Sequence, residues 1–403
     1  MSKITLAPLP RLRDILKSIF NKPISCKDLS EPWKLMESDT SYWFSSSTYA
    51  MLAIAKWYEL YTDKKSPTIW IPDYFCNAPL QLLRESNFIL HFYPITDKLI
   101  PDWESCRDQA ATIKPDIFFL VHYFGYPSDG HYARKFSNQY NSILVEDGAH
   151  VLIPQQDIGS YGEFTFYSPH KLLAIPDGSI LIQRSKTKVL RELSDNNPEE
   201  VMKQILDTMV QESPSTLIWL LKRILQKFLP EFLWIKRFEE EHNPNKTYIP
   251  NLLKPMQSEL SRRLLAIQLP YIDKHIIARK TNDAIINTFC NQSEKKVLSK
   301  VGNYIPYMSG IKCKTDFDTE KKIRFLKRNR SPVMKWPDLP PEVINKPENH
   351  TLAIELQKNL FFFPVHQSLN LSAIKRVGSL IGRNRKLKFN DDAYKLEWFK
   401  GSK

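Results

Sequence analysis

Residues 163–184 read EFTFYSPHKLLAIPDGSILIQR, so that one lysine, Lys171, stands between two short apolar runs. The runs EFTFY and SILIQR have the aromatic and β-branched composition of buried strands. A lysine at the end of a strand usually extends its ammonium group to water along an apolar stem. A lysine held away from water instead becomes a nucleophile that forms Schiff bases with aldehydes. These residues by themselves leave both interpretations open.

The composition indicates a chain that can bury large cores. It has 403 residues, 42% of them hydrophobic, and its length predicts about two or three domains. No apolar run reaches the roughly 18 residues of a membrane-spanning helix. The N-terminus has charges spaced through its apolar stretch and does not resemble a secretory signal, so we expect a cytoplasmic protein.

Charge and cysteine usage exclude several classes of function. The chain has 57 Lys and Arg against 44 Asp and Glu, a net charge of +13, which favours anionic partners such as phosphorylated substrates. No nucleic-acid-binding signature accompanies this charge, so we expect no nucleic-acid partner. The five cysteines are scattered without a CxxC pair, which predicts reduced thiols and no metal site.

Short apolar runs alternate with helical stretches between about residues 40 and 185. The expected strands and helices are PTIWIPDY, NAPLQLLRES, FILHFYPI, DIFFLVHYFG, GHYARKFSNQY and SILVEDGAH, in that order. Such alternation predicts a largely parallel sheet, and ligands of such sheets lie at the carboxyl ends of the strands. We therefore expect Asp73, His122, Asp147 and His150 at one edge.

The patterns divide the chain into four parts. We predict an N-terminal segment (1–40), a large α/β domain (41–250) with a helical insertion (about 190–245), a long helix with a smaller C-terminal α+β domain (251–377), and a basic tail (378–403).

A Schiff-base lysine requires an aldehyde cofactor, and pyridoxal 5'-phosphate makes further demands. Its phosphate needs hydroxyl and N–H groups at a helix start, which Ser46, Ser47 and Thr48 offer unless they form an ordinary N-cap. Its pyridine nitrogen needs a carboxylate, which Asp147 offers unless it only stabilises a turn. Its ring needs a flat neighbour, for which His150 or an aromatic residue of PDYFCNA, such as Phe75, is a candidate.

The order of these residues is more specific than any one of them. A hydroxyl-rich helix start precedes a strand-end aspartate by about 100 residues, and the lysine follows 24 residues later. The segments VHYFGYPSD, VEDGAH and SPHKLLAIPDGSILI resemble core segments of the DegT/StrS-type aminotransferases, which aminate keto sugars on nucleotide carriers. The similarity spans about residues 40–377, and it implies the fold type I of pyridoxal-phosphate enzymes, with a large domain around a mostly parallel sheet and a smaller C-terminal α+β domain.

The resemblance implies roles for particular residues. Lys171 would be the Schiff-base lysine, Asp147 the partner of the pyridine nitrogen and His150 the neighbour of the ring. The candidates for the remaining cofactor contacts are Ser47, Thr48, Phe75, Ser168 and Asn251. The sequence departs from the family pattern at Ser47, where a glycine is usual, and at Phe166, where the family has a serine.

The predicted function is an aminotransferase that uses pyridoxal phosphate, takes an amino group from a donor and transfers it to a nucleotide-linked keto sugar, within a homodimer, for surface polysaccharide or related biosynthesis. One alternative is a cysteine desulfurase-like lyase, suggested by His170 before the lysine and by Cys313 downstream. Another is a catalytically inactive protein that keeps the fold for regulation or assembly.

Residues 215–238, STLIWLLKRILQKFLPEFLWIKRF, have a basic amphipathic pattern. The expected apolar face consists of Trp219, Leu220, Ile224, Phe228, Phe232 and Trp234, and the basic residues are Lys222, Arg223, Lys227, Lys236 and Arg237. Such a segment either packs on the protein itself or lies on an anionic membrane surface. Pro230 divides it into two short helices.

Overall fold

The computed structural model describes residues 4–20, 29–155, 157–184, 187–228, 254–289, 295–296 and 304–382. None of the helices in these stretches is long and apolar enough to cross a membrane.

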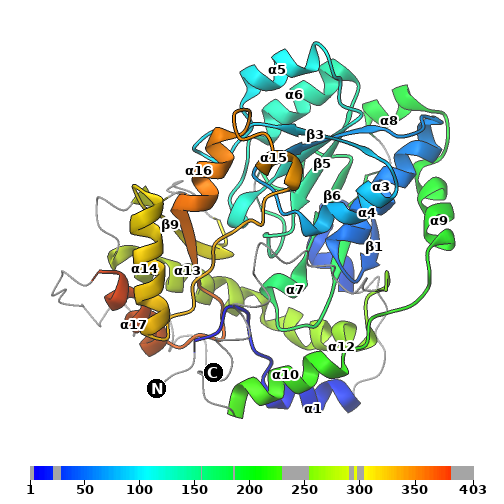
Figure 1. The fold of residues 1–403 in the computed structure, drawn as a ribbon. Coiled ribbons are helices and arrows are strands. Elements are labelled where there is room, and N and C mark those ends of the chain that lie inside the picture. The colour runs from blue at the N-terminus through cyan, green and yellow to red at the C-terminus, as the bar shows by residue number, and fades with distance from the viewer. Residues whose placement is uncertain are drawn as a thin grey trace.

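A seven-stranded sheet forms the centre of the molecule (Figure 1). Its strands are β1 (Thr40–Phe44), β2 (Thr68–Pro72), β3 (Ile89–Tyr93), β4 (Ile117–Val121), β5 (Ile143–Gly148), β6 (Phe164–Tyr167) and β7 (Ser179–Gln183). In space they follow the order β1-β7-β6-β5-β4-β2-β3, and of these strands β7 runs against the other six. The carboxyl ends of β2, β4, β5 and β6 therefore meet at one edge of the sheet.

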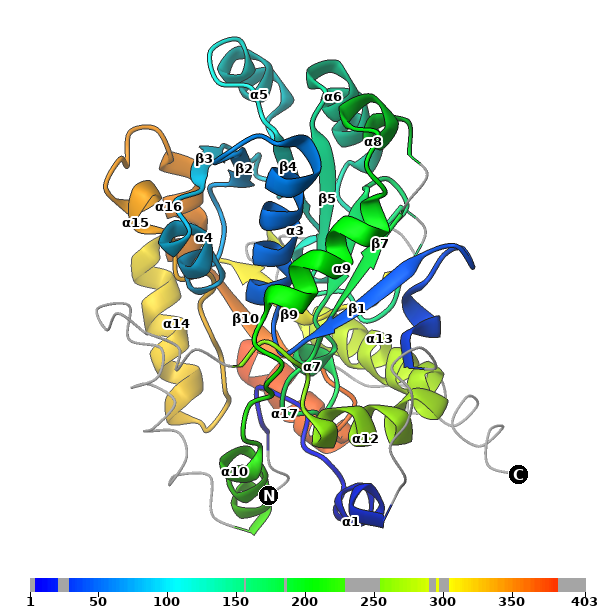
Figure 2. The ribbon, with the colours of Figure 1, turned by 90° about the vertical axis from the view of Figure 1, so that its right-hand side faces the viewer.

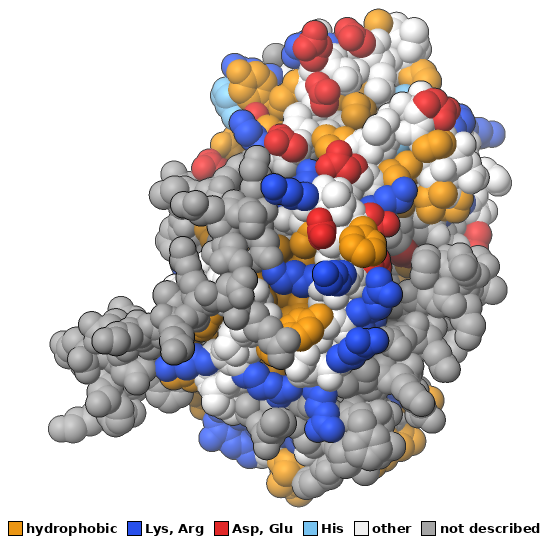
Figure 3. Space-filling model, turned by 60° about the vertical axis from the view of Figure 1, so that its left-hand side comes forward, with side chains coloured by type: hydrophobic (Ala, Val, Ile, Leu, Met, Phe, Trp, Pro, Cys, Tyr) orange, Lys and Arg blue, Asp and Glu red, His pale blue; other side chains and the backbone are white. Residues whose placement is uncertain are grey.

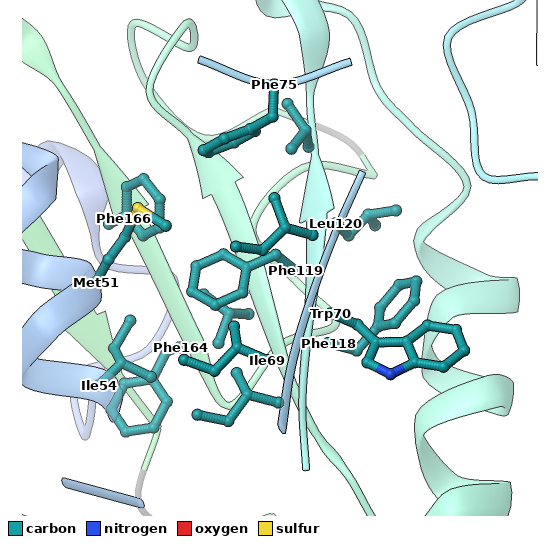
Figure 4. Packing of buried hydrophobic residues seen from close by; sticks show 14 of the residues in the cluster. Met51, Ile54, Ile69, Trp70, Phe75, Phe118, Phe119, Leu120, Phe164 and Phe166 are labelled. Carbon is teal, nitrogen blue, oxygen red and sulfur yellow. The ribbon is translucent and has the colours of Figure 1, made fainter. Parts of the chain in front are cut away.

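Helix α3 (Ser47–Thr62) covers one face of this sheet and is buried on nearly every side. Its sequence is apolar all round, which is typical of a helix enclosed by other elements. Met51 of α3 lies against Phe166 of β6 (Figure 4). One turn further along, Ile54 lies against Phe164. Phe166 thus belongs to the core between helix and sheet.

Most other helices of the first half connect successive strands. They are α4 (Gln81–Glu85), α5 (Trp103–Ala110), α6 (Gly130–Tyr140) and the short α7 (Pro169–Leu172), with the 3-10 turns η1 (Glu31–Trp33), η2 (Ala78–Leu80) and η3 (Tyr123–Gly125). Helix α6 packs against β4 and β5, and α5 packs against β3. These contacts complete the layer on the sheet face opposite α3 (Figure 2).

The predicted insertion contributes three helices to the described chain. They are α8 (Lys188–Leu193), α9 (Pro198–Thr208) and α10 (Leu217–Phe228). Helix α9 packs on α3, where Trp57 donates a hydrogen bond of 2.9 Å from Nε1 to the carbonyl of Pro198. Part of the insertion therefore covers the large domain, whereas α10 lies lower in the molecule (Figure 2).

The second half forms a smaller unit with its own core. Its elements are α12 (Glu259–Gln268), η4 (Leu269–Tyr271), α13 (Ile272–Phe289), β8 (Lys295–Lys296), β9 (Met308–Lys312), α14 (Asp316–Arg328), α15 (Pro341–Ile344), α16 (Thr351–Asn359), β10 (Leu360–Pro364) and α17 (Leu371–Ile381). The strands form an antiparallel sheet in the order β10-β9-β8, and α13 packs on α17. The N-terminal helix α1 (Leu12–Phe20) packs on α12.

The architecture confirms the expected fold class, and every expected strand between residues 67 and 150 is present. The long helix expected at the start of the part 251–377 is instead two helices, α12 and α13, joined by η4, because Pro270 cannot donate the backbone hydrogen bond of a continuous helix. Strand β1 was not predicted. Helix α17 continues to Ile381, three residues beyond Gly378, and the remaining tail lies outside the described residues.

Candidate active site

The register of two strands brings the predicted lysine and aspartate together. Strands β5 and β6 are parallel neighbours in which Asp147 pairs with Phe166 and Gly148 with Tyr167. The chain leaves β6 at Ser168 and turns through α7, where the amide of Lys171 donates a 3.0 Å hydrogen bond to the Ser168 carbonyl. Lys171 therefore lies beside the end of β5, because parallel strands present their carboxyl ends at the same edge.

A small pocket opens at this edge. Its lining consists of Ser47, Met51, Phe75, Cys76, Pro79, Val121, His122, Asp147, Ala149, His150, Lys171 and Trp336. The pocket thus contains the predicted residues Ser47, Phe75, Asp147, His150 and Lys171. Asp73 ends β2 at the same edge but accepts a 3.1 Å hydrogen bond from Nδ1 of His350.

Asp147 presents a carboxylate that the protein satisfies only in part. Its Oδ1 accepts a 2.8 Å hydrogen bond from the amide of Ala149, and Oδ2 has no hydrogen-bond partner among the described residues. Burial raises the pKa of Asp147, while the charge of Lys171 and the Ala149 amide act in the opposite direction. The free oxygen can therefore accept a proton or a hydrogen bond from a ligand in the pocket.

Glu146 occupies the other face of the same strand, since consecutive side chains in a strand alternate. Its carboxylate accepts hydrogen bonds from the amides of Gly159, Tyr161 and Gly162 at 2.8, 2.6 and 2.7 Å. Nδ1 of His122 accepts from the Ser128 amide, so the His122 proton is on Nε2 and is donated to Glu146 at 2.9 Å. Burial raises the pKa of Glu146, but these hydrogen bonds outweigh it and the pKa lies below its ordinary value.

Two further polar groups near the turn have no partner in the part of the chain that the structure describes. Among the described residues, Nζ of Lys171 makes no hydrogen bond or ion pair, although its backbone is fixed in α7. Three residues earlier, the Oγ of Ser168 is fully buried and also has no hydrogen-bond partner. Lys171 is partly buried and its side chain lines the pocket, so its unpaired amine is available to a ligand there. Buried polar groups are normally paired, so the Ser168 hydroxyl also has bonding capacity to spare.

His170, between them, has a different environment. Its Nδ1 donates a 2.7 Å hydrogen bond to the carbonyl of Gly178, and burial lowers its pKa to about 4. His170 is therefore neutral and closes the loop between α7 and β7. The structure gives it a role in fixing the turn of Lys171.

His150 belongs to an aromatic cluster at the seam of the two halves. Its ring is nearly parallel to those of Tyr307 and Phe124, with centroids 4.5 and 5.3 Å apart. Burial lowers the pKa of His150 well below its ordinary value, and the positive charge of Lys171 lowers it further. His150 and Phe75 both line the pocket, so both remain candidates for the flat neighbour of a ring there.

Gly125 allows the two halves of the chain to pack closely beside the pocket. It has a φ of +89°, and a Cβ at this position would lie 2.1 Å from the carbonyl oxygen of Ile305. Next to it, the Tyr307 amide donates a 2.8 Å hydrogen bond to the Phe124 carbonyl. A side chain at Gly125 would push the segment with Tyr307 away from the pocket.

Sequence reasoning missed three residues that border or support the pocket. Trp336 comes from a loop of the second half, and the thiol of Cys76 donates to Oδ1 of Asp338 at 2.9 Å. Arg279 of α13 is buried and donates a 2.7 Å hydrogen bond to the carbonyl of Leu172, immediately after Lys171. No local motif marks these residues, because each depends on contacts between distant segments.

The start of α3 borders the same pocket through Ser47. The N-cap residue, Ser46, makes no side-chain capping hydrogen bond, so its hydroxyl does not occupy the first N–H groups of the helix. A helix N-terminus attracts anions through these N–H groups. Thr48 does not line the pocket, and Asn251 lies outside the described residues.

The donors and acceptors fit pyridoxal phosphate. Asp147 offers an oxygen for the ring nitrogen, Lys171 an unpaired amine for the aldehyde, and the start of α3 with Ser47 a set of donors for the phosphate. Ser168, the other predicted phosphate contact, is fully buried and is not part of the pocket lining, although its hydroxyl is unpaired. Each of these groups has bonding capacity that the described protein leaves unused.

Comparison with known proteins agrees with this fold. The sequence matches no protein-family model and no curated protein. Spr1654 from Streptococcus pneumoniae, assigned as a sugar aminotransferase and solved in its PMP form, superposes with a TM-score of 0.68 at 14% identity, over 94% of this chain and 98% of that chain. Helicobacter pylori PseC, an aminotransferase involved in the biosynthesis of pseudoaminic acid, gives a TM-score of 0.63 at 14% identity and covers 94% and 98%.

A third solved structure connects the fold to the resemblance seen in the sequence. A DegT DnrJ EryC1 StrS aminotransferase from Brucella abortus superposes with a TM-score of 0.62 at 12% identity, over 92% of this chain and 93% of that chain. The chain therefore has, over nearly its whole length, the fold of these aminotransferases.

Proposed function

We propose that this protein is a pyridoxal-phosphate-dependent aminotransferase of the DegT/StrS type. The observation that carries the proposal is the meeting of an unpaired Lys171 amine and a half-satisfied Asp147 carboxylate in one pocket at the carboxyl edge of the sheet. When bound, the cofactor supplies an electron sink that allows an amino group to move between two carbon skeletons.

The chain's own residues would hold the cofactor and move protons. Lys171 would hold the aldehyde carbon through Nζ, release it to the amino donor, and then carry a proton between Nζ and the substrate carbon. Asp147 would keep the ring nitrogen protonated through Oδ2. The N-terminus of α3 with Ser47 would bind the phosphate, and His150 or Phe75 would cover the ring.

The proposed substrate is a keto sugar on a nucleotide carrier, used in surface polysaccharide or related biosynthesis. Support comes from the names of similar proteins, one a sugar aminotransferase and one active in pseudoaminic acid biosynthesis. The net charge of +13 suits a substrate that carries phosphates. A cytoplasmic location belongs to the same proposal.

We also propose a homodimer, since the enzymes that the chain resembles build each active site from two subunits. An obligate pair is expected to bury a large, mainly apolar area with twofold symmetry. Sedimentation at low concentration, with activity measured on the same samples, tests this. Full activity in a monomer contradicts it.

The lyase alternative receives no support from the cysteines that are described. Cys313 is buried in the core of the smaller domain, where its amide donates to the Asn359 carbonyl, and it does not line the pocket. Cys76 does line the pocket, but burial and the neighbouring Asp338 carboxylate raise its pKa well above the ordinary value. A protonated thiol is a poor nucleophile.

A binding and turnover experiment tests the proposed function. The protein saturated with pyridoxal phosphate is expected to show a visible absorption band that bleaches with glutamate or another amino donor and returns with a nucleotide-linked keto sugar. Borohydride reduction followed by peptide mapping is expected to place the adduct on Lys171. A band that no donor bleaches would favour the inactive alternative, and sulfide release from cysteine would favour the lyase.

A further inference from the structure

Helices α1 and α10 lie at the same end of the molecule, below α12 in both views (Figures 1 and 2). Arg263 of α12 donates a 3.2 Å hydrogen bond to the carbonyl of Ser18 in α1. Burial lowers the pKa of Lys227 in α10, and the charges of Asp14 and Arg11 act on it in opposite directions. The start of α1 therefore lies near the end of α10.

Helix α1 turns an apolar stripe toward solvent. Ile15 and Ser18 are buried against the protein. Beside them the helix exposes Leu12, Leu16, Ile19 and Phe20 by 44, 58, 58 and 83%. The exposed basic residues on the same helix and directly before it are Arg11, Arg13 and Lys17. A surface helix normally buries such a stripe, so this one indicates a binding surface.

Helix α10 repeats this arrangement. Trp219 of the predicted apolar face packs against the core around α12, and Leu220 and Ile224 are half-buried. The exposed apolar residues are Leu217, Ile218, Leu221 and Leu225, at 63, 66, 51 and 45%. Lys222 is exposed among them. The described part of the predicted apolar face therefore packs on the protein, which is the first of the two alternatives for this segment, while a second apolar stripe faces solvent. The side chain of Phe228 and residues 229–238 are not among the described parts of the chain.

We call the eight exposed apolar residues and the neighbouring basic residues the α1–α10 surface. We propose that this surface binds an anionic membrane. The eight residues make up eight of the twenty exposed large hydrophobic side chains in the described chain, so the clustering is pronounced. The sequence of α10 contains no acidic residue and that of α1 contains one, Asp14. Apolar side chains interleaved with Lys and Arg are the pattern of helices that lie in the headgroup region.

Charge separates this partner from a second copy of the chain. In a symmetric dimer through the same surface, the basic residues of one copy would face those of the other, and like charges repel across such an interface. These residues are Arg11, Arg13, Lys17 and Lys222. Anionic lipids attract the same residues. Lys and Arg also gather on the side of α14, so positive charge alone does not mark the proposed site (Figure 3). That second basic face supplies control positions.

Vesicle co-sedimentation of the full chain tests the proposal. The probes are vesicles of phosphatidylglycerol with phosphatidylcholine and vesicles of phosphatidylcholine alone, each at low and high salt. One variant combines Arg13→Gln, Lys17→Gln and Lys222→Gln, and a second combines Leu16→Ser with Leu221→Ser. The matched controls are Lys98→Gln, Lys321→Gln and Lys346→Gln together, and Phe317→Ser, whose side chain is 70% exposed on α14. All substituted positions are exposed, and thermal melting of each variant verifies folding.

Binding is expected with the anionic vesicles at low salt and is expected to weaken with salt. The triple charge variant should bind about a hundredfold more weakly, at roughly fivefold for each basic residue, whereas its control stays within about twofold. The serine variant should lose its binding to the anionic vesicles, because the apolar contact with the headgroup region is removed. Absence of the protein from the anionic vesicle pellet at low salt overturns the proposal. So does a serine variant that binds vesicles normally but turns a dimer into a monomer in analytical ultracentrifugation.

Discussion

Glu146 and Asp147 are consecutive acidic residues at the end of the same strand, and both are buried, yet the structure treats them oppositely. Glu146 receives three backbone amides and the Nε2–H of His122, and its pKa lies below the ordinary value. Asp147 receives one amide, and its pKa is raised by burial.

The difference separates a structural carboxylate from a functional one. A fully hydrogen-bonded carboxylate stabilises the fold and has no capacity left for a ligand. A buried carboxylate with a free oxygen destabilises the empty protein and gains its partner only on binding, which is typical of functional sites. The comparison predicts that chemistry depends on one face of β5 and stability on the other.

Replacing Lys171 with alanine is the strongest test of whether catalysis depends on the face of β5 that carries Asp147. We expect transamination to fall at least about 10⁴-fold, because the amine that holds and protonates the substrate carbon is removed. The fold should persist, since the Lys171 side chain has no partner among the described residues. The Lys98→Ala variant, at an exposed position, is the control. If Lys171→Ala and Lys98→Ala had comparable activity, the chemistry would not depend on the pocket side of β5.

Asp147→Asn is expected to have the next largest effect on turnover. The amide cannot hold a charge opposite the ring nitrogen, and the loss should be about 10²- to 10³-fold in kcat, or roughly 3–4 kcal/mol. The substitution is isosteric, so cofactor should still bind. Steady-state kinetics with a saturating donor measure the effect, and near-normal turnover would contradict the assignment.

Glu146→Gln is the matched substitution on the other face. Its amide group would present N–H donors to backbone N–H groups, so we expect unfolding to become easier by about 3 kcal/mol. Turnover per folded molecule should change little. Denaturant unfolding and kinetics on the same preparation separate the two effects. A variant that is stable but inactive would show that Glu146 belongs to the chemistry.

The smallest expected effect is the dependence of stability on pH, and it distinguishes most directly between Glu146 and Asp147. The folded pKa of Glu146 is below its ordinary 4.5, so its stabilisation is complete above about pH 4.5 and is lost as pH falls through the folded value. The folded pKa of Asp147 is above 3.8, so its ionised form destabilises the cofactor-free protein at neutral pH. Cofactor-free Asp147→Asn should therefore melt at a higher temperature at neutral pH, and Glu146→Gln at a lower one.

Differential scanning calorimetry without cofactor, from acid to neutral pH, measures both signs. Glu146→Gln should melt below wild type at neutral pH, and Asp147→Asn should melt above it. Both differences in melting temperature should become smaller as the pH is lowered. If both variants shifted the melting temperature in the same direction, the distinction between the two carboxylates would be contradicted.

The sequence by itself determined the alternating strands and helices, because apolar period and turn residues act locally. It also determined the order of a hydroxyl-rich helix start, Asp147 and Lys171, and parallel topology makes such residues converge at one edge. Glu146 could not be distinguished from Asp147 in this way, since the partners of Glu146 come from residues 122 and 159–162.

Only the tertiary structure decided the contacts between segments that are distant in the chain. Trp336 and the buried Arg279 reach the pocket region from the second half, and no local pattern predicts which loops meet there. Helices α3 and α10 are both rich in apolar residues, yet α3 is enclosed while α10 exposes Leu217, Ile218, Leu221 and Leu225. Composition fixes how much apolar surface a helix has, and only its neighbours decide how much of that surface is removed from water.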